Sequence, residues 1–551
     1  MSFLNEKEEV GRTIQSIRET AGNNVDIVVV NDASDDGYDY AKDIANYNVK
    51  YHVNSQRTGA AQGKELAVQL CDTPYFIILD AHMRFYDATW ANKLITELDS
   101  NPNQLICCQT KVLSKKDDGT LIDKGEMGVY GAYVTFSHEE LIPNIKWNSG
   151  NIATSLTDKQ IPAVLGASYC TSKTYWNKLK GLQGLIHYGC EEAYISLKAW
   201  LEGGGCKLID SITIGHIYRE KPPYHIDTIQ NNYNYYLIAN TLFPTFLKAK
   251  AHAVGLTLNK QLYLSVQDEI KKQSSQIAKL REYYSKTLCG NPFSYVAEIN
   301  DVLSSKDAII LKEEEHRLGD VISSLKDTVH QLSDVNLFHG QCGAMLPLAL
   351  YAHLYCDQEA DRQATILFNN ILNTLSSDIP ITFHHGLCGI GWAMVLLVNQ
   401  GVITFSDIQT ELHTIDSLVV ERSPRRVEDL TLSTGIGGIL AYILSRISIN
   451  PSPTPPFDHD YLKELYEASL RLHDTELKDW RTLTLANCFI DCYRHNTWLL
   501  TTPQPEDLFE LPTFLPKEQR YQKHGLDGSS GFALFLINRQ QRAKRFRLFD
   551  K

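Results

Sequence analysis

The sequence predicts an α/β domain followed by an all-helical domain. Two apolar runs, residues 25–30 and 75–79, each end in a polar segment, as buried strands of an open α/β sheet do. This alternation of strand and helix patterns stops near residue 255. The last part of the chain instead repeats a glycine motif that opens apolar runs at helical spacing, and this predicts stacked helical hairpins.

The run Tyr75–Leu79 ends in Asp80-Ala81-His82, which puts a carboxylate and an imidazole two residues apart at the end of a predicted strand. Residues i and i+2 of an extended chain share a face, so both side chains can reach one divalent cation. Such a cation would neutralise a diphosphate leaving group. An isolated Asp-x-His is more often a surface motif with no metal-ligand role. The surrounding motifs favour a metal site here.

Residues 25–30 form the second predicted strand, which runs into the turn-forming segment 31–37. Ligands of open α/β sheets bind beyond the carboxyl ends of the strands, so we expect Asp32 and Asp80 to face one crevice. Asp32 could there accept a hydrogen bond from a nucleotide base or ribose. The alternative is a turn-capping role, which we expect for Asp36.

A pair of glutamates, Glu191 and Glu192, precedes a helical pattern that ends at Gly203. They lie at the amino end of that helix, where the helix dipole favours negative charge. The two carboxylates are therefore either a stabilising first turn or a catalytic pair. His216 lies in the strand-like segments that follow and could complete the metal site, because two histidines and an aspartate suit a transition metal such as manganese.

The order of these motifs resembles that of nucleotide-sugar glycosyltransferases with the GT-A fold, and in particular polypeptide N-acetylgalactosaminyltransferases. The resemblance covers residues 1 to about 250. It implies a Rossmann-like nucleotide-sugar domain, a UDP-sugar donor and Mn²⁺ or another divalent cation. It is carried by the segments Phe3-Leu4-Asn5-Glu6, 31–37, Asp80-Ala81-His82, 188–192 and 215–219.

The resemblance also implies roles for single residues. The implied metal ligands are Asp80, His82 and His216. Arg57 falls where the family has a basic residue near the donor, and Ser168 falls where it contacts donor and acceptor. The implied donor-binding residues are Phe3, Leu4, Asn5, Glu6, Asp32, Arg57, Asp80 and Ser168.

The paired glutamates depart from the family. N-acetylgalactosaminyltransferases are retaining and carry Glu-Asn where this chain has Glu191-Glu192, whereas inverting relatives carry an acidic pair whose second member is the general base. We therefore expect Glu192 to be the base and Glu191 to be the second catalytic residue. Retention or inversion stays open.

A second departure concerns the first strand. The segment Met1-Ser2-Phe3-Leu4-Asn5 begins where the family would be finishing that strand, so several strand residues are expected to be missing. Either the start has been assigned too late or the chain was trimmed. A strand that is truly shortened would weaken the uridine pocket.

The composition agrees with a cytoplasmic enzyme. At 551 residues the chain is long enough for two or three domains, and its net charge of −12 argues against a nucleic-acid surface. No stretch approaches the roughly 20 apolar residues of a membrane span, and the short, charged amino terminus is not a signal peptide. The 12 cysteines are scattered, so free thiols are expected.

Three parts are predicted along the chain: a GT-A domain over residues 1–255, a helical connector over 256–329 and a repeat domain over 330–551. The connector contains charged amphipathic patterns over 261–285 and 304–329. Its charges alternate in sign, which is typical of a solvated spacer without chemistry.

The repeat domain has units that begin at His339-Gly340, His385-Gly386, Thr434-Gly435 and His524-Gly525. The last interval is about twice the others, so one degenerate unit is expected between. Glycines at helix starts permit close backbone approach where inner helices converge. The period predicts one helical hairpin per unit and a ring of hairpins.

This domain resembles the α/α toroid of lanthionine synthetase C-like cyclases over about residues 330–551. Those cyclases hold zinc with two cysteines and a histidine, one cysteine directly preceding the histidine of a His-Gly unit. Here Lys523 precedes His524, and Cys488 and Cys492 remain as candidate thiolate ligands. A zinc site needs three protein ligands, so zinc and cyclase activity are not expected, and the repeat histidines are expected to be structural.

The two resemblances together predict transfer of a sugar from a UDP-sugar to a Ser, Thr or Cys side chain of a peptide. The helical ring would bind the peptide and so raise its effective concentration at the active site. The alternatives are a transferase that extends a saccharide, a bifunctional or cyclising enzyme, and a degenerate domain that only binds. The sequence does not specify the sugar, the acceptor atom or the oligomeric state.

Overall fold

A computed structural model describes residues 1–116, 120–136, 141–149, 159–219, 225–304, 308–450, 454–474, 479–498, 500–516, 519–520 and 524–547. The chain divides into two compact units. The amino-terminal unit is built from Met1–Phe243 and Gln261–Lys306, and the helical unit is built from Pro244–Lys260 and Asp307–Leu548.

The amino-terminal unit contains a mixed sheet of six strands. In spatial order they are β4 (Tyr75–Leu79), β10 (Ser168–Ser172), β6 (Leu105–Lys115), β11 (Cys206–Ile217) and β5 (Met83–Arg84), with β7 (Leu121–Val129) paired to β6. β11 runs parallel to β6, whereas β10 is antiparallel to β4 and β6. β4 has the predicted bounds, and the strand-like segments around His216 form the single strand β11, which is irregular between Ile209 and Thr213.

The second predicted strand lies in a separate parallel sheet. β1 (Ser2–Phe3), β2 (Val28–Asn31) and β3 (Lys50–Val53) pair in that order. β2 thus starts at Val28 rather than at residue 25 and ends one residue beyond the predicted end. Two further strands, β8 (Ala132–Phe136) and β9 (Pro143–Trp147), form an antiparallel pair.

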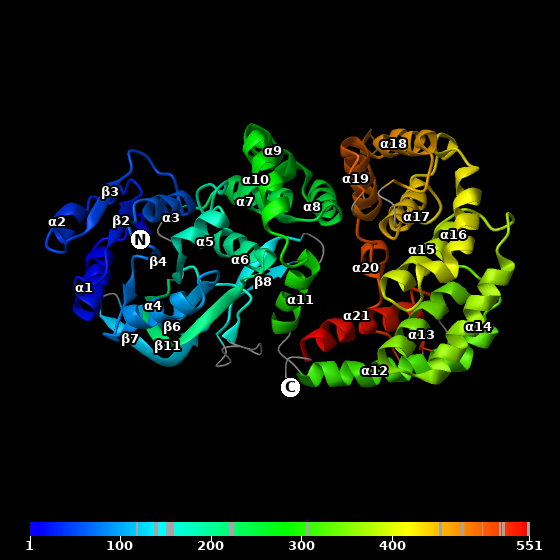
Figure 1. The fold of residues 1–551 in the computed structure, drawn as a ribbon, viewed down its shortest axis with the longest axis horizontal. Coiled ribbons are helices and arrows are strands. Elements are labelled where there is room, and N and C mark those ends of the chain that lie inside the picture. Colours follow the sequence, from blue (N-terminus) through cyan, green and yellow to red (C-terminus); the bar gives the residue numbers. More distant parts are fainter. Residues whose placement is uncertain are drawn as a thin grey trace. The chain divides into compact units, whose positions relative to one another are not determined.

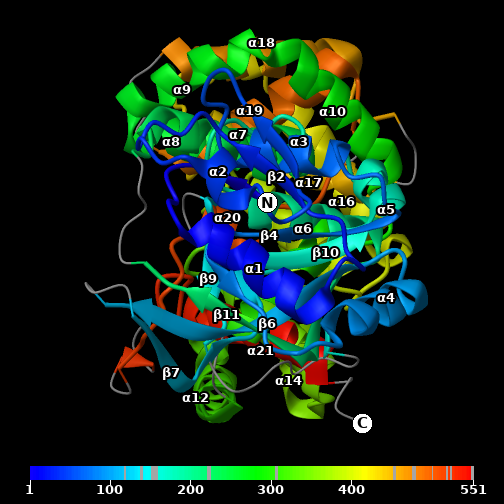
Figure 2. The ribbon, with the colours of Figure 1, turned by 90° about the vertical axis from the view of Figure 1, so that its left-hand side faces the viewer.

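Helices flank these sheets (Figures 1 and 2). α1 (Glu9–Ala21) crosses in front of the sheet in Figure 2, α3 (Ala60–Gln69) contacts β1 and β2, and α6 (Glu191–Glu202) is buried along most of its length. The other helices of this unit are α2 (Tyr40–Ile44), α4 (Trp90–Ser100), α5 (Lys173–Lys178), α7 (Thr228–Leu242), α9 (Lys260–Lys272), α10 (Ser274–Thr287) and α11 (Phe293–Ser304).

The helices predicted as a connector are shared between the units. α9, α10 and α11 belong to the amino-terminal unit, and α12 (Ala308–Thr328) belongs to the helical unit. The pattern over 261–285 forms two helices, α9 and α10. α10 contacts α7 and buries Ile277, Leu280 and Tyr284. It is thus packed into the core of the amino-terminal unit.

In the helical unit, buried helices alternate along the chain with amphipathic ones. α13 (Gln341–Tyr355), α15 (Leu387–Asn399) and α17 (Ile436–Ser448) are buried on nearly all sides, whereas α14 (Gln358–Thr374) and α16 (Phe405–Val420) bury one face. α13 contacts α21 (Ser529–Arg547) and α15, α15 contacts α17, and α17 contacts α19 (Trp480–His495). The unit also contains α8 (Thr245–Leu258), α18 (His459–Asp474), α20 (Pro505–Leu508) and short 3₁₀ turns at Val329–Gln331 and Pro424–Arg426.

The repeat glycines lie where backbone approaches backbone, but this approach is within the turn that precedes each helix, and it is not the predicted approach between converging helices. Gly386 is the N-cap of α15, and a Cβ on Gly389 one turn later would lie 1.9 Å from the carbonyl oxygen of Phe383. Gly343 and Gly438 face the carbonyls six residues before them in the same way. α19 begins where the degenerate unit is expected, and its N-cap is Asp479 rather than a glycine.

No helix in the described part of the chain is both long and apolar enough to cross a membrane. All 12 cysteines lie in described segments, and each is a free thiol, as predicted.

Candidate functional site

Three predicted metal ligands meet at one edge of the amino-terminal sheet. Asp80 directly follows β4, His82 directly precedes β5, and His216 on β11 pairs with Met83 of β5. One ligand atom from each side chain lies within 4.8 Å of the other two. Nε2 of His216 is 3.5 Å from Oδ2 of Asp80, and the two imidazole centroids are 4.9 Å apart. The structure therefore brings together a carboxylate and two imidazoles from three segments of the chain.

The state of these groups suits a metal ion. His216 is buried, and neither of its ring nitrogens has a hydrogen-bond partner within the described residues. Burial lowers the pKa of His216, and Asp80 opposes this shift in part; the lowered pKa favours the neutral ring, which is the form that binds a cation. Buried nitrogens without partners need an explanation, and a divalent cation held by Asp80, His82 and His216 would provide one.

Glu6 and Arg219 lie behind His82. Oε2 of Glu6 is 3.3 Å from Nδ1 of His82, and Arg219 pairs with both carboxylate oxygens of Glu6, with Nη1 2.8 Å from Oε1. Burial alone would raise the pKa of Glu6, but His82 and Arg219 hold it below its usual value. A carboxylate behind a metal-binding imidazole orients the ring and raises its basicity. Glu6 thus lies against a candidate metal ligand, and its predicted contact with the nucleotide stays a prediction.

The two glutamates occupy the first turn of α6, as predicted, and their environments differ. Glu191 is buried and its Oε2 accepts a hydrogen bond from the amide of Gly189 at 2.9 Å. Burial raises the pKa of Glu191 to about 7, with Lys64 opposing the shift and Glu192 adding to it. Glu192 is partly exposed, and its carboxylate lies against the backbone of Gly166, where a Cβ would be 1.9 Å from Oε1. Glu192 is therefore the more accessible member of the pair.

The turn before α6 is strained. His187 and Cys190 have φ values of 50° and 69°, in the left-handed region that non-glycine residues rarely adopt. The amide of Ala61 donates to the carbonyl of His187 at 3.1 Å, which ties this turn to the start of α3. Such strain persists where the surroundings hold it, and it is common at functional sites.

Lys64 is a residue that the sequence patterns did not single out. Burial would lower the pKa of Lys64, but Asp80, Glu191 and Glu192 raise it above its usual value. Burial alone would raise the pKa of Asp80. His216 and, to a smaller extent, Lys64 hold it below its usual value. One ammonium on α3 thus acts on the metal-binding carboxylate and on both glutamates. No local pattern marks Lys64, because its partners come from two other elements.

The carboxylate of Asp32 accepts hydrogen bonds from other residues of the chain. Oδ1 accepts hydrogen bonds from the amide and hydroxyl of Thr58 at 2.8 and 2.9 Å and from Asn54 at 2.9 Å. Oδ2 accepts from the amide of Gly59 at 2.7 Å. Asp32 therefore holds the loop that leads into α3. The acceptor positions of this carboxylate are filled, and its predicted contact with a nucleotide stays a prediction.

The other predicted donor-binding residues differ in exposure. Phe3 is buried, with its ring centroid 4.6 Å from that of Tyr40, and Leu4 is half-buried. Asn5 donates to Oδ1 of Asp35 at 2.8 Å. Ser168 is fully buried, and its hydroxyl has no hydrogen-bond partner among the described residues. Phe3 and Ser168 thus face the interior in this structure.

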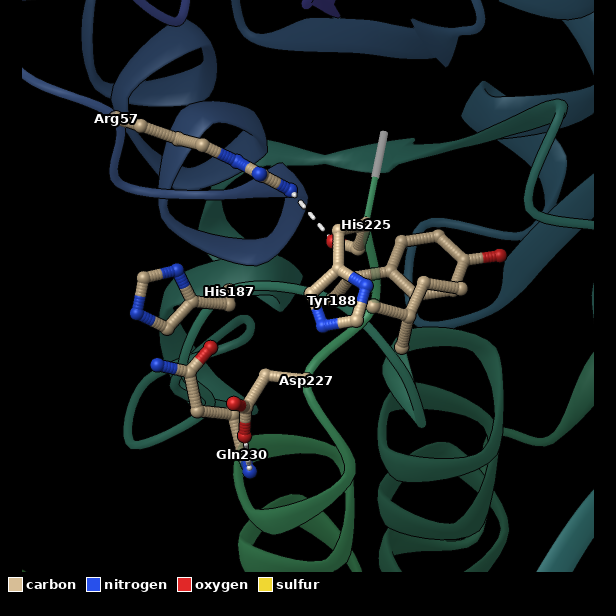
Figure 3. Close-up of a pocket in the computed structure, with 7 residues that line it drawn as sticks. Arg57, His187, Tyr188, His225, Asp227 and Gln230 are labelled. Atoms are coloured by element: carbon tan, nitrogen blue, oxygen red, sulfur yellow. Dashed lines mark hydrogen bonds between the residues drawn. The ribbon is translucent and has the colours of Figure 1, made fainter. Parts of the chain in front are cut away.

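Arg57 lines a pocket of about 220 Å³ (Figure 3). Its Nη2 donates to the carbonyl of His225 at 3.4 Å. Guanidinium, imidazole, carboxylate and amide groups lie around this space. The pocket is lined by Arg57, His187, Tyr188, His225, Ile226, Asp227 and Gln230.

An aromatic surface adjoins His216. The ring of Tyr218 stands edge-on to His216 at 4.2 Å and to Trp147 at 5.0 Å between centroids. Trp147 on β9 is 51% exposed. An exposed indole beside a candidate metal centre offers a face on which a sugar ring or an apolar side chain can pack.

In the helical unit, Cys488 and Cys492 lie one turn apart on α19, and both are buried. The repeat histidines contact protein groups: Nδ1 of His524 is 3.3 Å from the hydroxyl of Thr328, and Nδ1 of His339 is 3.5 Å from Oδ1 of Asp527. Lys523, which stands in place of the cyclase cysteine, lies outside the described residues.

Comparison with known proteins agrees with a glycosyltransferase domain. Residues 1–144 match the family model "Glycosyl transferase family 2". Polypeptide N-acetylgalactosaminyltransferase 11 of Xenopus tropicalis is 25% identical over 207 residues, which are 36% of this chain and 34% of that protein. Polypeptide N-acetylgalactosaminyltransferase 14 of Homo sapiens is 23% identical over 230 residues, 41% of each chain.

The chain therefore spans well under half the length of these two relatives. A solved structure of GalNAc-T7 with UDP, GalNAc and Mn²⁺ aligns with a TM-score of 0.41 at 18% identity, covering 54% of this chain and 55% of that one. Over residues 1–144 the chain is therefore similar to glycosyl transferase family 2, as the family model shows.

Proposed function

We propose that this chain transfers a sugar from a UDP-sugar donor to a hydroxyl or thiol group of a peptide, with Mn²⁺ or another divalent cation as cofactor. The observation that carries the proposal is the cluster of Asp80, His82 and His216, with the paired glutamates linked to it through Lys64. The match of residues 1–144 to glycosyl transferase family 2 supports the reaction class. The similarity to polypeptide N-acetylgalactosaminyltransferases supports a peptide acceptor.

The residues around the cluster have distinct roles in this proposal. Asp80, His82 and His216 would hold the cation, which when bound would neutralise the charge of the departing diphosphate. Glu6 keeps His82 oriented from behind. The buried Glu191 is suited to a hydrogen bond with a sugar hydroxyl, because its Oε1 has no partner among the described residues.

Glu192 is the proposed general base. It would take the proton of the acceptor hydroxyl or thiol while the acceptor atom forms its bond to the anomeric carbon of the sugar. The bond between that carbon and the diphosphate oxygen breaks, and UDP leaves. The partial exposure of Glu192 supports this role over Glu191, since a base must reach the acceptor.

The helical unit is proposed to be an α/α ring that binds the acceptor peptide. Its support is the succession of contacts from α21 through α13, α15 and α17 to α19, together with the repeated glycine turns. A peptide held there would have a raised effective concentration at the active site. A saccharide acceptor is the second candidate, and the exposed Trp147 favours it because an indole can pack on a sugar ring.

The proposal is tested by Mn²⁺-dependent release of UDP from UDP-GlcNAc, UDP-glucose and UDP-GalNAc. The wild type is expected to turn over one of these donors, and the double variant Asp80→Ala, His82→Ala is expected to be slower by at least about 100-fold. His52→Ala, which removes an exposed imidazole from β3 of the same unit, is the control. Equal rates in the wild type and the double variant, or no turnover and no UDP binding, would refute the proposal.

Mass spectrometry of the products distinguishes the two acceptor classes. Peptides with Ser, Thr or Cys and short oligosaccharides are incubated with the donor, and the added sugar mass is located. A modified peptide supports the first candidate, and modification of the saccharide alone supports the second. In either case Trp147→Ala is expected to raise the KM for the acceptor and leave donor hydrolysis unchanged.

A further inference from the structure

A lysine is fully buried in the amino-terminal unit, about two turns beyond Glu191 on α6. The ammonium of Lys198 donates to the carbonyl of Gly181, lies 3.4 Å from the hydroxyl of Tyr284 and is 3.8 Å from the ring centroid of Tyr194. Burying an ammonium is unfavourable unless it is paired and hydrogen-bonded. The proposed transfer makes no direct use of Lys198, so its place requires another explanation.

Lys198 binds the carbonyl of the peptide unit between Gly181 and Leu182, and Glu65 binds the amide of that same unit. Oε1 of Glu65 accepts the hydrogen bond from the amide of Leu182. The carbonyl and amide of a trans peptide point in opposite directions, so this peptide lies between a carboxylate and an ammonium with its dipole aligned to both. Gly181 has a φ of 39°, and a Cβ there would lie 1.9 Å from Oε1 of Glu65, so this turn requires glycine.

The two charges depend on each other. Burial lowers the pKa of Lys198 well below its usual value and raises the pKa of Glu65, and each charge opposes the shift of the other. Removal of one would leave the other buried without its counter-charge, whereas removal of both is often tolerated.

α3 is also tied to the turn before α6, near the candidate active site, where the amide of Ala61 donates to the carbonyl of His187 at 3.1 Å. Lys64, next to Glu65 on α3, acts on Glu191 and Glu192 at the start of α6. α3 is thus linked to the region of α6 by hydrogen bonds both at the turn that precedes Glu191 and at the peptide unit bound by Lys198. α10 takes part as well, because the hydroxyls of Tyr284 and Tyr194 are 3.1 Å apart.

We propose that Glu65 and Lys198 are positioning residues. Through the peptide unit 181–182 they fix α6 against α3 and so set the place of Glu191 and Glu192 relative to Asp80. This inference rests on the proposed transferase function, since it assigns both residues a part in that reaction. It also makes α10 a structural element of the catalytic unit.

The test compares Lys198→Met with the double variant Lys198→Met, Glu65→Gln, each assayed well below its own unfolding midpoint. Both are expected to lose about 10- to 100-fold in kcat while the KM for the donor stays within about twofold, because a small misplacement of reacting groups has effects of this size. The double variant is expected to regain stability but not kcat. A purely structural pair would lower the unfolding midpoint and leave kcat of the folded protein unchanged, which would overturn the inference.

Two further variants keep the test decisive. Lys178→Met removes an exposed lysine of α5 that pairs with Glu202 of α6. This variant is expected to behave as the wild type. Tyr284→Phe removes a single hydroxyl and serves if Lys198→Met does not fold. A several-fold loss of kcat in Tyr284→Phe supports the inference, and wild-type kcat in Tyr284→Phe and in the double variant refutes it.

Failure of the proposed function can be told apart from failure of this inference. If the wild type turns over no donor and binds no UDP, the transferase proposal has failed, and crystal structures of the variants then test the positioning role. Lys198→Met is then expected to show the Glu192 carboxylate displaced from Gly166. An unchanged contact between Glu192 and Gly166 would refute the positioning role without any activity measurement.

Discussion

Glu191 and Glu192 are neighbours on the first turn of α6, yet the buried Glu191 responds to pH differently from an exposed carboxyl. Its pKa is raised from 4.5 to about 7, chiefly by burial. Between these two values the unfolded chain has released a proton that the folded protein still holds. The free energy of unfolding therefore falls as the pH rises through this interval. The stability that the protonated Glu191 contributes is fully present below pH 4.5.

Glu191→Gln is accordingly expected to stabilise the metal-free protein at neutral pH. The advantage over the wild type should be small near pH 4 and grow to the order of 3 kcal/mol above pH 7, because the variant has no carboxylate to ionise. Urea unfolding from pH 4 to 8 measures the difference. Glu19→Gln, at an exposed position of α1, should show no such trend, and a difference that is constant with pH would contradict the prediction.

Asp32 offers a test between two roles for one carboxylate. If it holds the loop into α3, Asp32→Ala should lower stability by about 2–4 kcal/mol even without nucleotide, because four hydrogen bonds lose their acceptor. Thermal unfolding without UDP, compared with UDP titration, gives the answer. Unchanged unfolding together with weakened UDP binding would instead favour the nucleotide contact that the sequence predicts.

At the scale of single residues, the sequence predicts which side chains belong to the candidate site better than it predicts what those side chains contact. Asp80 and His82 follow from the end of one strand, although the chain bends at 81–82 instead of staying extended as the prediction assumed. The contacts of Glu6 with His82, and of Lys64 with the glutamates, join segments that are far apart in the chain. Local patterns cannot encode such contacts, because they depend on how the elements pack.

At the scale of elements, the inner helices of the helical unit depend on glycines at their starts. Gly389→Ala would place a Cβ 1.9 Å from the carbonyl oxygen of Phe383, so the start of α15 would have to move. We expect a loss of stability of about 3 kcal/mol, measured by thermal or urea unfolding. Gly319→Ala on α12 is the matched control, because no atom lies within 4 Å of its new Cβ.

The control should change stability in the opposite direction. An alanine in an open helical position stabilises by about 0.5–1 kcal/mol relative to glycine. If Gly389→Ala and Gly319→Ala both stabilised the protein, the close backbone approach at α15 would not be what requires glycine there.

The sequence predicts element types well and their breaks less well. β4 has the predicted bounds, and α6 starts at Glu191 and is capped by Gly203, as the periodicity indicates. The continuous helical pattern over 261–285 is broken between α9 and α10, at Gln273. Hydrophobic periodicity indicates which face of a helix is buried. Two successive helices can have the same periodicity although the chain changes direction between them, so the break is not visible in the pattern.

At the scale of the whole molecule, the boundary between the units does not follow the change in sequence pattern. The predicted end of the first domain, residue 255, falls inside α8 (Thr245–Leu258), which belongs to the helical unit and contacts α19. Lys248 pairs with Asp491 at 2.7 Å and Lys250 with Asp507 at 2.9 Å. Simple truncation at residue 255 would therefore damage both units, and full-length variants are needed to assign their roles.

Since each unit has its own core, we expect two unfolding transitions in scanning calorimetry, and Mn²⁺ should raise the midpoint of one. A ligand that binds the folded state stabilises it by about 2.7 kcal/mol at 100 times its dissociation constant. The shift should disappear in His216→Ala and persist in His52→Ala, because His216 is part of the cluster and His52 is an exposed residue of β3. If Mn²⁺ moved both transitions equally in the wild type, the cation would stabilise more than the amino-terminal unit, and the assignment of the metal site to that unit alone would fail.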